Sequence, residues 1–259
     1  MYYFLRFGYE GYKFSGFQRG NGNNSVEDSI LKVLKENSLA SDISCAARTD
    51  RGVSATGNVL KLSSDESAEK IAGILNSHCE GIFVSAYAEV KEDANPRHCL
   101  RKTYSYFLRD TPDTTLLSSQ LSLFAGTHDF HLFCRMDSRN PVRTIERIEV
   151  IRTGEKTVRV DFTARSFVWM QIRNIMGFSI ENASRGRLID PFQVNSWSRK
   201  PASPLPLVLT DISYQSIEFT NVYSGSKEKY YTRAVEEQWS RYMITEHIVT
   251  ELGRSHIYR

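Results

Sequence analysis

Residues 46–55, Ala-Ala-Arg-Thr-Asp-Arg-Gly-Val-Ser-Ala, place one carboxylate between two guanidinium groups and then turn at a glycine. The segment has neither helical nor alternating apolar periodicity, which predicts a loop, followed by a strand at 57–62. A carboxylate beside fixed positive charge stays ionised well below neutral pH, and an ionised Asp50 on a loop held by a scaffold can act as a nucleophile or a base. The same residues also suit a structural Asp–Arg pair that closes a turn, because ion-pair networks perturb carboxylates as well.

The segment from residue 97 to residue 109 interleaves basic and aromatic side chains and contains no acidic residue. Residues 103–108 alternate as a strand with one solvated face does. Tyr104 and Tyr106 lie on the same face of that strand, because residues two apart along a strand share a face. With Arg97 and Arg101 beside them, they suit a groove that holds a nucleic-acid backbone and stacks a base. A solvated strand face with tyrosines at its rim fits the segment equally well.

Residues 167–180 are apolar on almost every side, which predicts a helix that is buried on most of its surface. Arg173 and Asn174 nevertheless lie in the middle of this helix. A buried arginine needs a counter-charge, because an unpaired charge in a core is very costly. Asp50 is a natural partner for Arg173, although the guanidinium could instead extend along the helix edge to solvent.

The composition is that of an ordinary globular protein, with 41% hydrophobic and 24% charged residues over 259 positions and a net charge of +3. No apolar run approaches the length of a membrane span, and the N-terminus lacks the basic lead and cleavage site of a signal peptide. The four cysteines are far apart and form no Cys-x-x-Cys pair, so neither a zinc site nor a disulfide framework is expected. His128 and His131 lack the spacing of a metal-binding helix face and are interpreted as loop or core histidines. We expect a cytoplasmic protein with reduced thiols and no bound metal.

The remaining periodicities predict the order of the other elements. Ser25, with Asp28 at the capping-box position, begins a helix after a turn at 20–24. Further strands are predicted at 2–7, 82–90, 143–151, 157–163 and 207–214, and further helices at 66–77, 116–125 and 232–252. The order of elements before and after about residue 98 is loosely similar, which suggests two related halves.

Several separated motifs resemble, in the same order, those of TruA-type tRNA pseudouridine synthases. They lie at 9–19, 25–27, 48–55, 101–106, 126–130, 143–145 and 166–177, and the resemblance covers roughly residues 2–214. It implies an α+β fold in which two related α/β halves form one largely antiparallel mixed sheet, with helices on one side and a central RNA-binding cleft. The expected parts are an N-terminal half at 1–98 with the Asp loop, a C-terminal half at 99–219 with the tyrosine strand and the arginine helix, and a helical extension at 220–259.

The resemblance also implies the activity and its residues. The family isomerises uridine to pseudouridine in tRNA, usually at positions 38–40 of the anticodon arm, without a cofactor and as a homodimer. By motif match, Asp50, Tyr104 and Arg173 are the catalytic residues, and Arg48 and Leu207 bind the extruded nucleotide. The basic residues Arg97 and Arg101 are expected to contact the RNA backbone.

Three positions depart from the family pattern. Glu10 replaces the usual Asp, Pro206 stands where Gly usually precedes the pocket leucine, and residues 182–186 replace a Gly-x-Gly after the arginine helix. The last two bear on the width of the pocket and the end of the helix rather than on the reaction. Two alternatives remain: an inactive RNA-binding module of the same fold, and a glycoside-type hydrolase, which would require a second carboxylate for Asp50.

Overall fold

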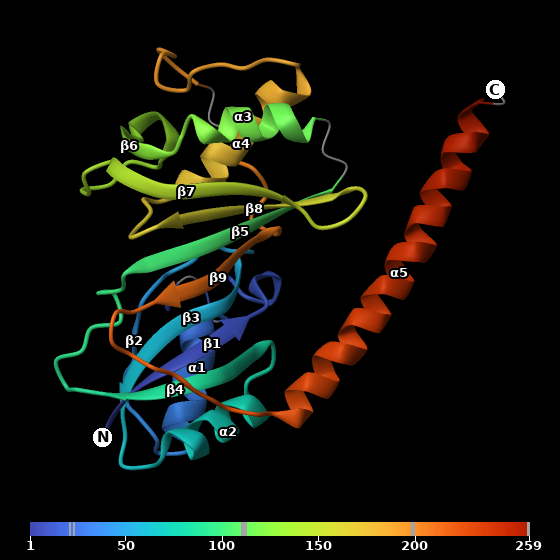
Figure 1. Cartoon of the computed structure of the whole chain (residues 1–259). Coiled ribbons are helices and arrows are strands. Elements are labelled where there is room, and N and C mark those ends of the chain that lie inside the picture. Colours follow the sequence, from blue (N-terminus) through green and yellow to red (C-terminus); the bar gives the residue numbers. More distant parts are fainter. Residues whose placement is uncertain (21, 23, 110–112, 198–199, 258–259) are drawn as a thin grey trace. The chain divides into compact units, whose positions relative to one another are not determined.

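The computed structural model describes the whole chain except residues 21, 23, 110–112, 198–199 and 258–259 (Figure 1). The described chain forms two compact units, Met1–Val222 and Tyr223–Arg259. Each unit is described by itself below. The further division of the first unit near residue 98 stays a prediction, and the predicted turn at 20–24 includes two positions outside the described residues.

One ten-stranded sheet organises the first unit (Figure 1). Its strand order is β10-β4-β1-β3-β9-β5-β8-β7-β6, and β2 pairs with β3 outside this path. Among the described strand pairs, β3 with β9 is parallel and the others are antiparallel. The predicted single, largely antiparallel mixed sheet is therefore confirmed. The strands are β1 Tyr2–Tyr9, β2 Ser44–Cys45, β3 Ser54–Ser63, β4 Ile82–Val90, β5 Arg101–Arg109, β6 Gly126–Asp129, β7 Val142–Arg152, β8 Thr157–Ala164, β9 Leu207–Ser213 and β10 Thr220–Asn221.

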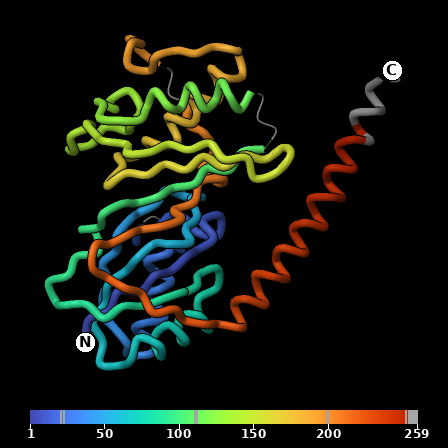
Figure 2. Tube along the Cα trace, viewed as in Figure 1, coloured from blue at the N-terminus to red at the C-terminus, as the bar shows by residue number. Residues whose placement is uncertain are grey.

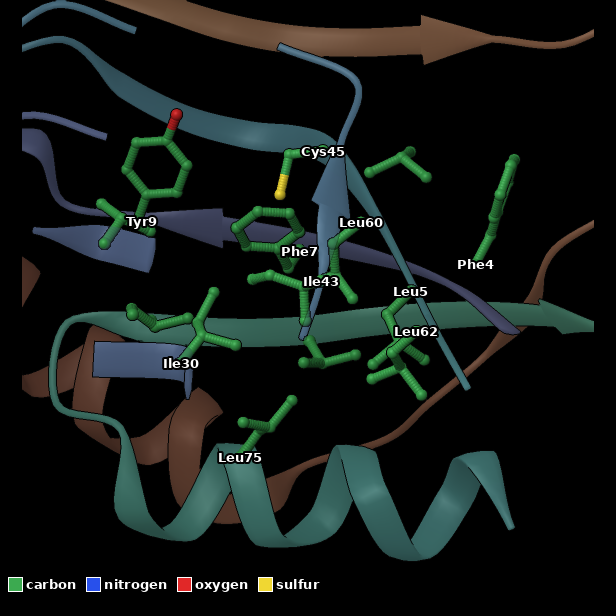
Figure 3. Close-up of a cluster of buried hydrophobic side chains, with 14 of the residues drawn as sticks. Phe4, Leu5, Phe7, Tyr9, Ile30, Ile43, Cys45, Leu60, Leu62 and Leu75 are labelled. Carbon is green, nitrogen blue, oxygen red and sulfur yellow. The ribbon is translucent and has the colours of Figure 1, made fainter. Parts of the chain in front are cut away.

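Helices α1 (Val26–Glu36) and α2 (Ala68–His78) pack on the first half of the sheet. Helix α1 begins where the sequence predicts, because the Ser25 hydroxyl accepts a hydrogen bond from the backbone N–H of Asp28 at 3.0 Å. Leu75 of α2 and Ile30 of α1 join Phe7 and Leu60 from the strands in one buried cluster (Figure 3). A short 3-10 helix, Gly11–Lys13, follows β1. This core supports the loop that carries Asp50.

Helices α3 (Thr114–Ser122) and α4 (Gln171–Ser184) belong to a second core with strands β5, β7 and β8. A second 3-10 helix, His131–Phe133, packs there too. Several predicted boundaries were wrong, and the starts of α3 and α4 have clear local causes. Helix α3 begins two residues earlier than predicted because the Asp113 carboxylate caps its first turn. Helix α4 begins at Gln171 rather than 167, because Met170 has a left-handed backbone with φ of 64°.

Strand β9 joins the two cores into one sheet. It lies between β3 and β5, as the orange segment of Figure 2 shows. Its parallel pairing with β3 places Ser54 opposite Val208, and its antiparallel pairing with β5 places Tyr104 opposite Leu209. Because Ser54 directly follows the Asp50 loop, β9 fixes the spacing between that loop and Tyr104.

The second unit is a single helix, α5 (Gly225–Ile257), which is longer at both ends than the predicted 232–252. Its apolar side chains Val235, Trp239, Met243 and Ile248 are all exposed. No described helix of the chain is both long enough and apolar enough to cross a bilayer. All four cysteines are buried and free, as the sequence predicts.

Candidate active site

The loop between β2 and β3 is held from three sides, so that Asp50 has a defined position. The carbonyl of Thr49 accepts a hydrogen bond from the backbone N–H of Phe17 at 3.2 Å, and the Thr49 hydroxyl lies 2.8 Å from the hydroxyl of Tyr9. At the start of the loop, the Lys102 ammonium donates to the carbonyl of Ala46 at 2.6 Å. The loop therefore rests on β1, on the segment after it and on β5.

The loop turns at Gly52, which has φ of 86°. A side chain disfavours this backbone conformation. A Cβ at this position would also lie 3.1 Å from the ring of Pro204, in the segment before β9. Both features explain why the sequence has a glycine two residues after Asp50.

Asp50 and Arg173 form the ion pair that the buried arginine of α4 requires. Arg173 Nη1 lies 3.4 Å from Asp50 Oδ2, and the two side chains are 15% and 29% exposed. The guanidinium is fixed independently, because Arg173 Nε donates to the carbonyl of Ala202 at 2.9 Å, and the backbone N–H of Ala202 donates to the carbonyl of Arg173 at 2.8 Å. The ion pair thus joins the loop that carries Asp50 to α4 and to the segment before β9.

A second donor to Asp50 was not predicted from the sequence. Trp169 Nε1 donates to Asp50 Oδ1 at 2.9 Å, so each carboxylate oxygen has its own contact. No pattern in the sequence pointed to this contact, since Trp169 lies in an apolar run that was predicted to be helical. The signal that could have suggested it is the chemistry of tryptophan itself, whose indole N–H usually finds a partner when the ring is partly buried.

An open cavity of about 620 Å³ lies over these groups. This volume falls within the roughly 300–1,000 Å³ of small-molecule sites. Four arginines and one carboxylate, Asp50, are the charged residues that line it, so its electrostatic character is basic. The lining residues are Ser15, Gly16, Gln18, Arg48, Thr49, Asp50, Arg51, Val53, Tyr104, Arg139, Phe167, Val168, Trp169, Met170, Gln171, Ile172, Arg173 and Leu207.

Tyr104 borders the same cavity from β5. Its ring packs edge-to-face with Phe167, at 5.4 Å between centroids. Burial raises the pKa of the Tyr104 phenol well above its usual value, and the nearby Asp50 carboxylate raises it further. The phenol is therefore protonated at neutral pH. Leu207, at the start of β9, is buried and contributes an apolar part of the wall.

Five of the seven residues singled out in the sequence, Arg48, Asp50, Tyr104, Arg173 and Leu207, line the cavity together. Arg97 and Arg101 are not among the lining residues. Both are exposed, and Arg101 pairs with Glu146 of β7 across the sheet.

Two further lining arginines, Arg51 and Arg139, were not singled out as binding residues. Arg51 belongs to the Asp50 motif itself. Arg139 lies in the loop before β7 and is held there by the carboxylate of Asp137, with 2.8 Å from Nε to Oδ2.

Comparisons with known proteins show which proteins the chain is similar to. The sequence model of a family described as tRNA pseudouridine synthase matches residues 121–215. A tRNA pseudouridine synthase A of Thermoplasma acidophilum is 42% identical over 97% of this chain and 98% of its own length. One of Pyrococcus furiosus is 35% identical over 90% of both chains. Among solved structures, one described as a pseudouridylate synthase aligns over 88% of this chain and 72% of its own length, with 12% identity and a TM-score of 0.35.

Both sequence relatives are named tRNA pseudouridine synthase A. With 42% identity over nearly the full length of both proteins, the chain belongs to the tRNA pseudouridine synthase A family, and the TruA-type resemblance is confirmed.

Proposed function

We propose that the protein isomerises uridine to pseudouridine in tRNA and that Asp50 is its catalytic carboxylate. The observation that carries the proposal is the placement of Asp50 against Arg173 and Trp169 in a basic cavity, in a chain whose relatives are named for this activity. Arg173 balances the charge of the carboxylate without covering it, since Asp50 remains 29% exposed.

The reaction breaks the bond between N1 of uracil and C1′ of the ribose, turns the base, and joins C5 to C1′. The proton on C5 is then lost and N1 gains one, so the product is an isomer of the substrate. Asp50 assists either by attacking the ring or the sugar or by removing a proton from the sugar. This chemistry consumes no cofactor, and we propose that none is bound.

Tyr104 provides the surface on which the flipped base stacks. Extrusion of a base costs a few kcal/mol, which stacking in a pocket offsets. Because the raised pKa keeps its phenol protonated at neutral pH, Tyr104 enters the reaction as a hydrogen-bond donor or proton relay near C5, rather than as a phenolate base.

The other residues of the cavity wall and the basic residues outside it bind the RNA. Arg48 holds the extruded nucleotide and Leu207 packs against it, with Arg48 exposed and Leu207 buried. Arg97 and Arg101 lie outside the cavity, where they contact the tRNA backbone and make binding salt-dependent. We further propose that the target lies at positions 38–40 of the anticodon arm, and that the protein acts in the cytoplasm as a homodimer.

The two alternatives have less support. A glycoside-type hydrolase needs a second carboxylate as acid, and among the described residues that line the cavity Asp50 is the sole carboxylate. An inactive RNA-binding module would have no need for the contacts that orient both oxygens of Asp50.

The test uses tRNA labelled with tritium at C5 of uridine. The wild-type protein is expected to release tritium to water, and Asp50→Asn to release none while it still binds tRNA. Equal release by both proteins would remove Asp50 from its role. Mapping of the product pseudouridines then gives the target positions.

A further inference from the structure

We infer that Trp169 is a positioning residue for the reaction and orients the carboxylate of Asp50 through its indole N–H. The inference rests on the proposed function and extends it to a residue with no assigned role. Trp169 Nε1 lies 2.9 Å from Asp50 Oδ1, a shorter contact than the 3.4 Å between Arg173 Nη1 and Oδ2. A hydrogen bond of this length restrains rotation of the carboxylate about its Cβ–Cγ bond.

The local backbone brings both donors to one carboxylate. Trp169 precedes α4 and Arg173 lies in its first turn, with the left-handed Met170 between them. In a continuous helix, Trp169 and Arg173 would instead be stacked along one face at a spacing of four. A left-handed conformation at a residue other than glycine persists only where its surroundings hold it, and here the contacts of the flanking residues do so.

The indole ring is held from its other side. The Arg135 guanidinium lies over the ring at 4.2 Å from its centroid, and the backbone N–H of Arg135 donates to the carbonyl of Trp169 at 2.9 Å. Val168, the residue before Trp169, is held as well. The Oε1 of Gln171 accepts a hydrogen bond from the backbone N–H of Val168 at 2.9 Å. The ring, which is 39% exposed, is thus packed against Arg135 and its backbone is anchored, which is the kind of support that a residue positioning another side chain needs.

The two donors have different consequences for the carboxylate. Arg173 brings a full positive charge and is also tied to Ala202. The indole N–H is a neutral donor, so it can orient Oδ1 without adding a second charge. Loss of the indole N–H therefore leaves the ion pair in place and frees the rotation of the carboxylate.

The test compares Trp169→Phe with Trp197→Phe. The first removes the N–H and keeps an aromatic ring beside Arg135. The second is a matched control, because the buried Trp197 Nε1 has no hydrogen-bond partner and its ring stacks on Phe133, outside the cavity. We expect Trp169→Phe to lower kcat for tritium release at least tenfold with KM for tRNA within twofold, and Trp197→Phe to leave kcat within threefold.

A second measurement needs no turnover. The chain has three tryptophans, so protein labelled with ¹⁵N-tryptophan gives three indole N–H resonances, which the Trp→Phe variants assign. Asp50→Ala is expected to shift the Trp169 resonance strongly and to leave those of Trp197 and Trp239 in place. Asp50→Asn, which keeps an acceptor oxygen, is expected to shift it less.

Two results would overturn the inference: a Trp169 resonance that does not respond to Asp50→Ala, or a Trp169→Phe variant that keeps wild-type kcat. A rise in KM without a fall in kcat would overturn it as well, because it would make Trp169 an RNA contact. Absence of tritium release from the wild type would instead refute the proposed function, and the resonance shift would still decide whether the contact exists.

Discussion

Replacement of Arg173 by glutamine separates the structural and the catalytic contributions of its pair with Asp50. The variant removes the positive charge and the contact of Nη1 with the carboxylate, and it leaves Asp50 with the hydrogen bond from Trp169. Arg173→Lys keeps the charge, but a single ammonium cannot reproduce the guanidinium geometry that reaches both Ala202 and Asp50.

The magnitude follows from the geometry and the burial. Two unit charges 3.4 Å apart attract each other by about 5 kcal/mol at an effective dielectric constant of 20. Desolvation cancels part of this attraction, and breaking a fully buried pair costs about 3–5 kcal/mol. Because Asp50 is 29% exposed, we expect Arg173→Gln to lower the free energy of unfolding by about 2 kcal/mol. In a unit of this size, that corresponds to a fall in Tm of about 4–8 °C.

Activity is expected to fall further than stability suggests. Removal of one preorganised donor from a charged transition state typically lowers kcat by about 10²–10³. We therefore expect Arg173→Gln to lower kcat for tritium release at least 100-fold at a temperature where the variant is folded. Arg173→Lys should recover part of the stability and little of the activity.

Arg185→Gln is the matched control. Arg185 follows α4 and pairs with Glu181 at 3.0 Å, but its side chain is 58% exposed. Such a pair is worth about 0.5 kcal/mol or less, so Tm should change by no more than about 2 °C and kcat should be unchanged. The reasoning fails if Arg173→Gln melts no lower than this control. It also fails if Arg173→Gln keeps kcat within threefold of wild type.

Two further predictions follow from the phenols. Tyr104→Phe is expected to bind tRNA normally and to lower kcat at least tenfold. The control is Tyr106→Phe, which should change kcat less than threefold, because the Tyr106 hydroxyl donates to the carbonyl of Ser203 outside the cavity. Normal turnover by Tyr104→Phe would limit Tyr104 to stacking. Burial raises the pKa of several tyrosines, so the folded state retains their protons above pH 10 while the unfolded state loses them, and stability must fall as pH rises beyond 10. Above pH 10, each such tyrosine lowers the free energy of unfolding by up to about 1.4 kcal/mol per pH unit. Urea unfolding at pH 8, 10 and 11 measures the total loss. A free energy of unfolding that stays constant over this range would contradict the raised pKa of Tyr9, Tyr104 and Tyr214.

The sequence predicted those elements whose signals are local. The Ser25 hydroxyl accepts from the backbone N–H of Asp28 and donates to its carboxylate, contacts that depend only on neighbouring residues, and α1 begins where that pair predicts. The hairpin of β7 and β8 could be predicted equally well from the sequence, since its alternating strands flank a short turn at 154–155. The start of α4 was not, because the left-handed Met170 is imposed by tertiary contacts and not by a glycine.

The long-range contact between Asp50 and Arg173 could be anticipated for an energetic reason. A buried arginine on a mostly apolar helix needs a counter-charge, and Asp50 was the natural partner, although the sequence left open that the guanidinium extends along the helix edge to solvent. Arg97 and Arg101 show that the residue types of a segment do not predict which side chains line a cavity. A basic sequence segment does not reveal which way its side chains point, and Arg101 is directed across the sheet to Glu146 and not into the cavity.

The cavity depends on the short pairing of β3 with β9 because its chemical groups come from distant parts of the chain. Asp50 precedes β3, Tyr104 lies on β5, and Leu207 begins β9, which pairs with both strands. At Gly57 of β3, a Cβ would lie 2.3 Å from the carbonyl oxygen of Thr210 in β9, so the two backbones approach more closely than any side chain would permit. A shift of β9 by one residue would turn Leu207 to the opposite face of the sheet and separate Tyr104 from Asp50. The distance between the Asp50 carboxylate and the Tyr104 ring is therefore set by backbone register, while Arg173 and Trp169 each contact one oxygen of the carboxylate.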